Sequence, residues 1–275
     1  MPTRSAQKHR RRHDNHEKIS MAALVTGAGR RIGRAMALHL ARRGYDVAVH
    51  YSGSRDAAFE TVAEIRAMGR QAEAIQADLL DEDATQGLIG RAVGAVGPLT
   101  VLVNNASIFE EDSLETATRR SWDRHIGSNL RAPFVLIQGF AAQVPKAASD
   151  GEPLAQGLVV NMIDQRVHKL TPQFMTYTLA KAALWTLTRT AAQALAPHVR
   201  VNAIGPGPTL AGARQSEEDF RRQRAATVLG RGAGPEDIAA ALDYLLGARA
   251  VTGQLICPDG GQHLAWETPD VVGVE

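Results

Sequence analysis

The stretch AALVTGAGRRIGRAMALHLARRG, residues 22–44, joins a short apolar run to a glycine-rich turn and then to a segment with helical spacing. Ile32, Met36 and Leu40 recur at the interval of one helix face, and Gly44 is a suitable place for that helix to end. The stretch therefore predicts a strand, a tight turn and a helix in direct succession.

The same alternation continues along the chain. We expect further strands at 46–51, 72–78, 99–105, 157–163, 199–207 and 253–261, and helices at 55–68, 81–95, 113–143, 177–196 and 235–247. The strands are nearly continuous in valine, isoleucine and leucine, which is typical of a parallel sheet buried on both faces. The pattern predicts an α/β fold, a doubly wound parallel sheet with helices on both faces, whose ligands lie beyond the carboxyl ends of the strands.

The chain has 275 residues, of which 44% are hydrophobic and 22% charged, a composition that suits one large α/β domain. No linker or repeat interrupts residues 21–265, so we expect a single catalytic domain there and a tail over 266–275. No apolar run is long enough to predict a membrane span. The one cysteine, Cys257, cannot form an internal disulfide, which favours a cytoplasmic protein.

Positive charge is concentrated in the extension over residues 1–20, and the rest of the chain is slightly acidic. An acidic body does not predict a nucleic-acid-binding domain. The segment QKHRRRHDNHEK, residues 7–18, is either a basic arm that touches nucleic acid or a disordered, solvated extension, and we favour the extension. Met21 directly precedes the first strand and is an alternative start of the chain.

The turn TGAGRRIG, residues 26–33, follows a strand and opens a helix, so we interpret it as a dinucleotide-binding turn rather than a plain one. An NAD site usually has an acid at the end of the second strand. Here residues 50–55 are HYSGSR, and the first acid is Asp56. Hydroxyls, a histidine and arginines suit a 2′-phosphate, so we expect NADP(H). The alternative is that Arg30 and Arg31 are merely solvated on a surface turn.

Polar residues follow the other strands as well. Asp78 is expected to accept a hydrogen bond from the adenine, and NNAS, residues 104–107, to form a wall of the cofactor site, although either could be a strand-end turn. The expected cofactor contacts are Gly27, Arg30, Arg31, Ile32, Gly33, His50, Tyr51, Ser52, Ser54, Asp78, Leu79, Asn105, Ala106, Ser107, Met162, Tyr177, Lys181, Pro206, Gly207 and Thr209.

A catalytic group is expected in VVNMIDQRVHKLTPQFMTYTLAK, residues 159–181. Tyr177 and Lys181 share a helix face, and a neighbouring ammonium favours the phenolate and tunes the phenol as a proton donor. Asp164 ends a buried strand thirteen residues before the tyrosine. Asn129 is a candidate to hold a water that links Lys181 to solvent. A Tyr–Lys pair at this spacing is frequent on helix surfaces. Together with the nucleotide turn and the NNA motif, it indicates a catalytic pair.

Together these motifs resemble the short-chain dehydrogenase/reductase family over residues 21–265. The matching pieces are TGAGRRIG, NNAS, Asn129, YTLAK (residues 177–181) and GPGPT (residues 205–209). The resemblance implies a seven-stranded Rossmann sheet, a nicotinamide cofactor, usually a homotetramer, and a Tyr–Lys pair that completes hydride transfer.

Two departures narrow the resemblance. Most members carry serine where this chain has Asp164, and glycine where it has Arg31; both replacements recur in the pteridine reductases and the bacterial dihydromonapterin/dihydrofolate reductases. That branch implies NADPH-dependent reduction of a dihydropterin at a ring C=N, with Asp164 and Tyr177 supplying the proton. Phe109 is expected to stack on the pterin, and Arg31 and Ser107 to contact it. The alternatives are that Phe109 is only an aromatic residue of the core and that Asp164 only caps the end of its strand.

Two other functions stay open. One is a carbonyl reductase of 3-oxoacyl or sugar-alcohol type, and the other is a protein that senses NADPH without chemistry. The histidines show no metal-ligand spacing, so we expect no metal site. Residues 208–232 are charged and contain several glycines, which favours a lid over the substrate, and residues 144–157 are expected to be an exposed connection.

Overall fold

The computed structural model describes residues 21–212 and 215–267. The basic extension over 1–20, residues 213–214 of the expected lid and residues 268–275 of the tail lie outside the described residues. The strands are β1 (Ala22–Val25), β2 (Asp46–Tyr51), β3 (Ala72–Gln76), β4 (Val101–Asn104), β5 (Ala148–Ser149), β6 (Pro153–Leu154), β7 (Gly157–Met162), β8 (Val199–Ile204) and β9 (Leu255–Ile256). The α-helices are α1 (Arg31–Arg42), α2 (Arg55–Ala67), α3 (Glu82–Val96), α4 (Arg119–Ile126), α5 (Ala132–Gln143), α6 (Met175–Leu195), α7 (Glu217–Ala225) and α8 (Pro235–Gly247).

Seven strands form one parallel sheet in the order β3-β2-β1-β4-β7-β8-β9, which confirms the expected α/β fold. The order reverses between β1 and β4, and a reversal of this kind opens a crevice at the carboxyl ends of the strands. The central register pairs Leu24 with Leu102, and Leu102 with Val159. The sheet therefore brings the residues that follow β1, β4 and β7 to one edge.

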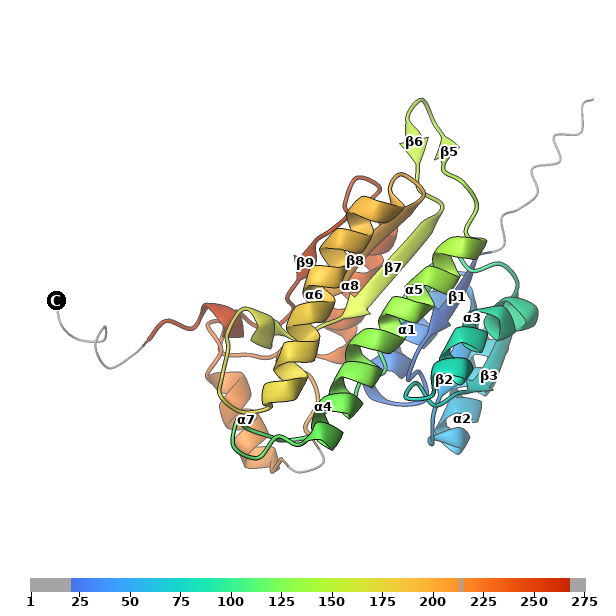
Figure 1. Ribbon diagram of the computed structural model, residues 1–275. Helices are drawn as coiled ribbons and strands as arrows, with labels where there is room; N and C mark the ends of the chain where they lie inside the picture. Colours follow the sequence, from blue (N-terminus) through green and yellow to red (C-terminus); the bar gives the residue numbers. More distant parts are fainter. Residues whose placement is uncertain (1–20, 213–214, 268–275) are drawn as a thin grey trace, which may run out of the picture.

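Helices cover both faces of the sheet, as the apolar strands require. Alternate residues point to opposite sides: Val25, Val103 and Val160 pack with α1, α2 and α8, whereas Leu24 and Leu102 pack with α3, α5 and α6. Figure 1 shows α5 and α6 lying across one face, with α4 and α7 toward the carboxyl ends of the strands. None of the helices in the described ranges is long and apolar enough to cross a membrane.

The structure differs from the sequence-based expectation in its connections. The expected exposed connection over 144–157 contains the small antiparallel hairpin β5–β6, which projects from the end of the sheet opposite α7 (Figure 1). The expected helical region from residue 113 starts only at Arg119, and a π turn over Gly127–Arg131, η1, separates α4 from α5. The expected lid contains the helix α7, and β9 has only two residues.

A buried polar ladder joins β4, β7 and α6. Asn104 donates to the Asn161 side chain at 2.9 Å, and the Asn161 amide donates to the Thr188 hydroxyl at 2.9 Å. Thr188 in turn donates to the carbonyl of Leu184 at 2.9 Å. All of these side chains are buried, so each bond replaces one that water cannot supply. The ladder fixes α6 relative to the strand that ends next to Asp164.

Asn161→Ala is expected to lower the free energy of unfolding by about 2–4 kcal/mol, because it leaves the Asn104 amide and the Thr188 hydroxyl buried with fewer partners. The matched control is Gln86→Ala on the exposed side of α3, where a change within about 0.5 kcal/mol is expected. Urea unfolding followed by circular dichroism measures both. Equal stabilities for the two variants would mean that the ladder does not hold the helix.

Candidate active site

Two adjoining cavities lie at the carboxyl ends of the strands, one of about 900 Å³ and one of about 650 Å³. The residues singled out from the sequence that line the larger cavity are Arg31, Ile32, Asn105, Ser107, Phe109, Met162, Asp164, Tyr177, Lys181, Pro206, Gly207 and Thr209. Those that line the smaller cavity are Gly27, Arg30, Arg31, Ile32, Gly33, His50, Ser52, Ser54, Asp78, Leu79, Asn105, Ala106 and Ser107. The fold thus brings nearly all of them together, and their roles toward ligands stay predictions.

The glycine turn after β1 is closed tightly against the end of β4. Gly27 has a φ of +62°, a left-handed conformation that favours glycine. A Cβ added at Gly33 would lie 2.3 Å from the Gly27 carbonyl oxygen and 2.4 Å from the Asn105 amide nitrogen. The Asn105 amide donates to the carbonyls of Thr26 and Gly27, at 2.8 and 3.2 Å. The turn therefore has the close packing and the helix N-terminus that a pyrophosphate requires.

His50 does not supply charge for a 2′-phosphate, which corrects the expectation from the sequence. The residue is 1% exposed, its Nδ1 accepts the Gly27 N–H at 3.0 Å, and its Nε2 lies 3.1 Å from the Ala77 carbonyl oxygen. Burial lowers the pKa of His50 to about 4, so the ring is neutral near pH 7. The histidine lines the cavity, but it ties the glycine turn to the end of β3.

Tyr51 was also expected to contact the cofactor, and the structure places it elsewhere. Its ring is 8% exposed and packs edge-on against Phe59 at 6.4 Å between centroids, outside both cavities. Neighbouring strand residues face opposite sides of a sheet, and the side of Tyr51 is filled by α2. The polar groups that line the cavity beyond β2 come from Ser52 and Ser54, with Arg30 across from them.

Arg31 lies on the border of the two cavities. Its φ of +55° is unusual for a residue with a side chain and is a conformation that favours glycine. Its guanidinium donates to the carbonyls of Ala211 and Leu210, at 2.9 and 3.1 Å. In this conformation Arg31 connects the dinucleotide turn to the start of the expected lid.

Asp164 uses its two oxygens differently. Oδ1 accepts the backbone N–H of Arg166 at 2.8 Å and so caps the short turn η2 (Gln165–Val167), whereas Oδ2 accepts the hydroxyl of Tyr177 at 3.0 Å. The capping role weighed from the sequence is therefore real, but it engages only one oxygen. Lys181 lies one turn further along α6, and its Nζ donates to the carbonyl of Met162 at 2.7 Å.

Burial sets the protonation of these three groups. Desolvation raises the pKa of Asp164, and desolvation together with the nearby Asp164 charge raises the pKa of Tyr177 well above its ordinary value. Desolvation lowers the pKa of Lys181 to about 8. Lys181 was expected to favour the phenolate, but its Nζ is turned toward a carbonyl and lies 5.6 Å from the centre of the Tyr177 ring. The phenol is thus a neutral hydrogen-bond donor to the acid.

Asn129 does not face the lysine. It is fully buried in the π turn η1 and lines neither cavity. Its Oδ1 accepts the N–H of Ile108 at 2.9 Å, and its Nδ2 donates to the carbonyl of the same residue at 2.8 Å. Because Ile108 engages both ends of the amide, the side chain is used to hold the backbone after β4, and the water link between Asn129 and Lys181 stays a prediction. Asn129 thereby fixes the segment between β4 and Phe109.

Phe109 is part of the cavity wall and not of the hydrophobic core. It is 48% exposed, and it stacks on Phe174 with 4.3 Å between centroids and 7° between planes. The ring of Tyr177 lies 4.7 Å away at 74°. Phe174 has a φ of +56°, a conformation that costs energy for a non-glycine residue. The chain accepts this cost to place a second aromatic ring at the cavity.

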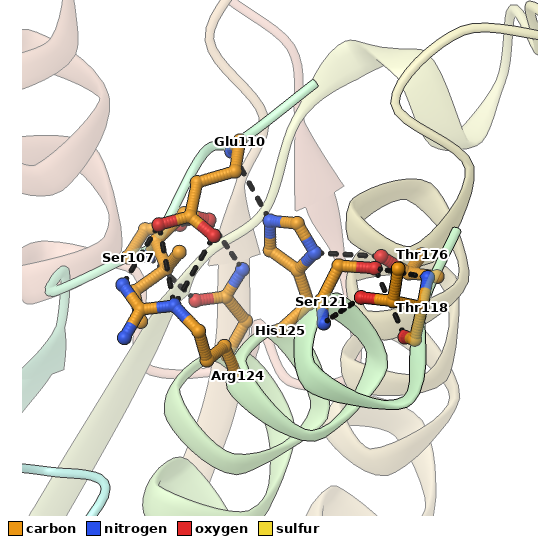
Figure 2. Close-up of polar contacts among 9 residues, drawn as sticks. Ser107, Glu110, Thr118, Ser121, Arg124, His125 and Thr176 are labelled. Atoms are coloured by element: carbon orange, nitrogen blue, oxygen red, sulfur yellow. Dashed lines mark hydrogen bonds and ion pairs between the residues drawn. The ribbon is translucent and has the colours of Figure 1, made fainter. Parts of the chain in front are cut away.

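A buried polar chain anchors the segment that carries Phe109 (Figure 2). The imidazole of His125, on α4, accepts the Glu110 N–H through Nε2 at 3.1 Å, and its Nδ1 lies 2.6 Å from the Thr176 hydroxyl. Because Nε2 is an acceptor, Nδ1 carries the hydrogen and donates it to Thr176. The Thr176 hydroxyl donates onward to the carboxylate of Asp112. The imidazole of His125 and the hydroxyl of Thr176 therefore each have a hydrogen-bond partner on both sides.

The same network reaches both ends of the site. Glu110 forms an ion pair with Arg124 at 2.7 Å, and Figure 2 shows the two side chains on the opposite side of the imidazole from Thr176. Thr176 directly precedes Tyr177 in α6. The network therefore fixes the position of the phenol relative to the segment that holds Phe109, without contacting either ring by a hydrogen bond.

Several residues of the larger cavity were not predicted from the sequence. Phe174, Gln165 and Arg166 line it, as do Gln215, Asp219, Phe220 and Gln223 from the region of α7 and Gln262 near the end of the described chain. Arg166 could have been predicted as a residue of the site, because it is a cation two residues after Asp164. The described ranges contain no group of three or more histidine, cysteine, aspartate or glutamate side chains placed to hold a metal ion.

The fold and the Tyr–Lys pair define the class of protein, and comparisons with known proteins agree. A family model described as enoyl-(acyl carrier protein) reductase matches residues 27–263. A 3-oxoacyl-[acyl-carrier-protein] reductase, FabG, from Staphylococcus aureus is 35% identical over 252 residues, covering 90% of this chain and 100% of that protein. The chain belongs to the short-chain dehydrogenase/reductase family, a family of oxidoreductases.

Solved structures give a closer likeness. FolM alternative dihydrofolate reductase 1 from Brucella suis, crystallised with NADP, is 46% identical with a TM-score of 0.85 and covers 92% of this chain and 98% of that one. A short-chain dehydrogenase from Burkholderia cenocepacia, also with NADP, is 33% identical with a TM-score of 0.79, covering 88% and 98%. These proteins are relatives that bind NADP.

The lowered pKa of Lys181 makes stability depend on pH. Between about pH 8 and the ordinary value of 10.5, the unfolded chain binds a proton at this amine that the native protein does not, so stability rises with pH in that window. The difference in unfolding free energy, wild type minus Lys181→Met, should therefore rise by about 1–3 kcal/mol from pH 7.5 to 9.5. Denaturant unfolding across this range measures it. For the exposed Lys169→Met variant, the difference in unfolding free energy should not change with pH. An unchanged difference for Lys181→Met would contradict the lowered pKa of the buried amine.

Proposed function

We propose that this protein reduces a dihydropterin to its tetrahydro form, with NADPH as the hydride donor and a ring C=N as the acceptor. The observation that carries the proposal is the hydrogen bond of 3.0 Å between Tyr177 and the partly buried carboxylate of Asp164, inside a cavity walled by two stacked aromatic rings. The 46% identity with a Brucella dihydrofolate reductase of this family supports it.

The residues around the glycine turn fit NADPH better than NADH. The end of β2 presents Ser52 and Ser54 to the cavity with Arg30 near them, and no carboxylate takes the place that would bind a free 2′-hydroxyl. Asp78 and Leu79 would border the adenine, and Asn105 and Ala106 the adjoining ribose. When bound, the cofactor supplies a hydride; the chain's own residues orient the substrate and deliver the proton.

Delivery of the proton falls to Asp164 and Tyr177. A ring nitrogen gains a proton when the neighbouring carbon is reduced, and a group that donates there must hold a proton near neutral pH. The raised pKa of Asp164 favours its protonated form, and the raised pKa of Tyr177 keeps the phenol neutral. In our proposal the phenol holds the carboxyl group in place while the acid passes the proton to the substrate nitrogen. Lys181, which lines the same cavity, would contact the cofactor ribose.

Binding of a flat heterocycle would use Phe109. One face of its ring is covered by Phe174, so the pterin would lie toward Tyr177, between Phe109 and the nicotinamide side of the cavity. Ser107 and Arg31 line the same space and would contact the polar edge of the ring. A pterin offers donors and acceptors side by side, which a carboxyl group, a hydroxyl and a guanidinium can match together.

A second candidate is a carbonyl reductase. It is favoured by the match to the enoyl-(acyl carrier protein) reductase model and by the 35% identity with a 3-oxoacyl-[acyl-carrier-protein] reductase. An L-rhamnose 1-dehydrogenase from Azotobacter vinelandii, 33% identical over 88% of this chain and 96% of that protein, points the same way. A carbonyl oxygen needs a neutral hydroxyl donor, and Asp164 stands where that donor would be.

A substrate panel decides between the candidates. Oxidation of NADPH is followed at equal enzyme with dihydrobiopterin, dihydromonapterin, dihydrofolate, an acetoacetyl thioester and a sugar lactone. Turnover of dihydropterins at least a hundredfold above that of the carbonyl compounds is expected. Turnover of the thioester alone would reverse the assignment, and tight NADPH binding without any oxidation would indicate a sensing protein.

Asp164→Ala should lower kcat for dihydropterin reduction by about 10²–10⁴-fold, because the proton donor is lost. Its affinity for NADPH should stay within about threefold of wild type, since the acid is not placed among the cofactor contacts. Steady-state kinetics and fluorescence titration with NADPH measure the two effects. Asp83→Ala, an exposed acid on α3, is the control. Near-normal turnover by the Asp164 variant would remove the acid from the mechanism.

A further inference from the structure

The cavity wall beyond Asp164 contains two polar groups without partners. Gln165 and Arg166 form the short turn after the acid, and both line the larger cavity. Among the residues that the structure describes, the Oε1 atom of Gln165 and the Nε atom of Arg166 are buried and have no hydrogen-bond partner. A buried polar atom without a partner is costly. Both atoms are closed to solvent in this conformation, so a small turn of each side chain toward the cavity would let a ligand complete their bonding.

The guanidinium of Arg166 is held in a fixed place. It lies over the ring of Phe174 at 5.1 Å, and its Nη1 donates to the hydroxyl of Thr171. Its backbone N–H binds Asp164 at 2.8 Å, which sets its distance from the reacting groups. The edge of the guanidinium that carries Nε is the one without a partner. Turned toward the cavity, that edge would present two parallel N–H groups to a carboxylate.

Within residues 21–212 and 215–267, no carboxylate forms an ion pair with Arg166. Asp219 lines the same cavity but pairs with Arg222 at 2.8 Å, and Asp164 is engaged by Tyr177. Glu111 also lines the cavity. The cavity therefore contains a guanidinium that no carboxylate of the described chain contacts directly, although Asp164 lies close enough for Arg166 to lower its pKa.

We propose that Arg166, with Gln165 beside it, forms a subsite for the anionic tail of a folate-type substrate. The enzyme would then prefer a dihydropterin whose tail carries carboxylates to one with a neutral side chain. This inference rests on the proposed function, because it assumes a pterin ring against Phe109. From there the tail passes along the stacked ring of Phe174, which leads it to the guanidinium above that ring. Gln165 can accept an N–H of the tail.

The test is the ratio of kcat/KM for dihydrofolate to kcat/KM for dihydrobiopterin, which lacks a charged tail. Wild type should favour dihydrofolate, and Arg166→Gln should lower the ratio at least tenfold, mainly through a higher KM for dihydrofolate. Arg166→Lys keeps the charge but loses the bidentate geometry, so its ratio should lie between the other two. Thermal unfolding of each variant checks that the fold is retained.

The matched control is Arg189→Gln, an arginine that also lies over an aromatic ring, Trp185, at 5.0 Å, but does not line the cavity. Its ratio should equal that of wild type. An unchanged ratio in both Arg166 variants, with dihydropterins still reduced, would overturn the subsite and leave the proposed function intact. If wild type reduces neither pterin, the proposed function fails and the subsite fails with it.

Discussion

A carboxylate that shares a hydrogen bond with a phenol at the wall of a large cavity is the constraint on which the site depends. One oxygen of Asp164 caps a turn and the other accepts the Tyr177 hydroxyl. The acid follows β7 and the phenol lies on α6, so their contact requires that strand and helix stay in register. The buried ladder through Asn161 fixes this alignment, because it links β7 to α6 by hydrogen bonds between buried side chains.

Many polar residues at the strand ends build the site instead of contacting its ligands. His50 and Asn105 close the glycine turn, Asn129 holds the segment after β4, and His125 joins that segment to the start of α6. Loops carry unpaired backbone groups that must find partners when they are buried. Because these side chains satisfy the backbone, the segments that carry Asp164 and Tyr177 are held in place at the wall of the cavity.

The sequence predicted the sheet well because apolar strands and helical spacing are local signals. It also brought together most of the site, since every parallel strand ends at the same edge. The role of each residue could not be predicted from the sequence, because the residue type does not show which groups a side chain contacts. His50 and Asn129 both bond to backbone groups, and Tyr51 faces α2. The αL conformation of Phe174, the hairpin β5–β6 and the position of Arg166 depend on contacts between distant segments, which no local pattern encodes.

A buried acid beside a buried amine is an expensive arrangement for stability, and this cost bears on its purpose. Desolvation raises the pKa of Asp164 and lowers that of Lys181, so each charge is disfavoured where it lies, and the two do not form a direct ion pair within the described residues. A hydroxyl in place of the acid would cap the turn and avoid burying a charge. The proposed reduction of a ring C=N would need a group that can hold a proton and release it to the ring nitrogen, which a carboxyl with a raised pKa provides and a hydroxyl does not.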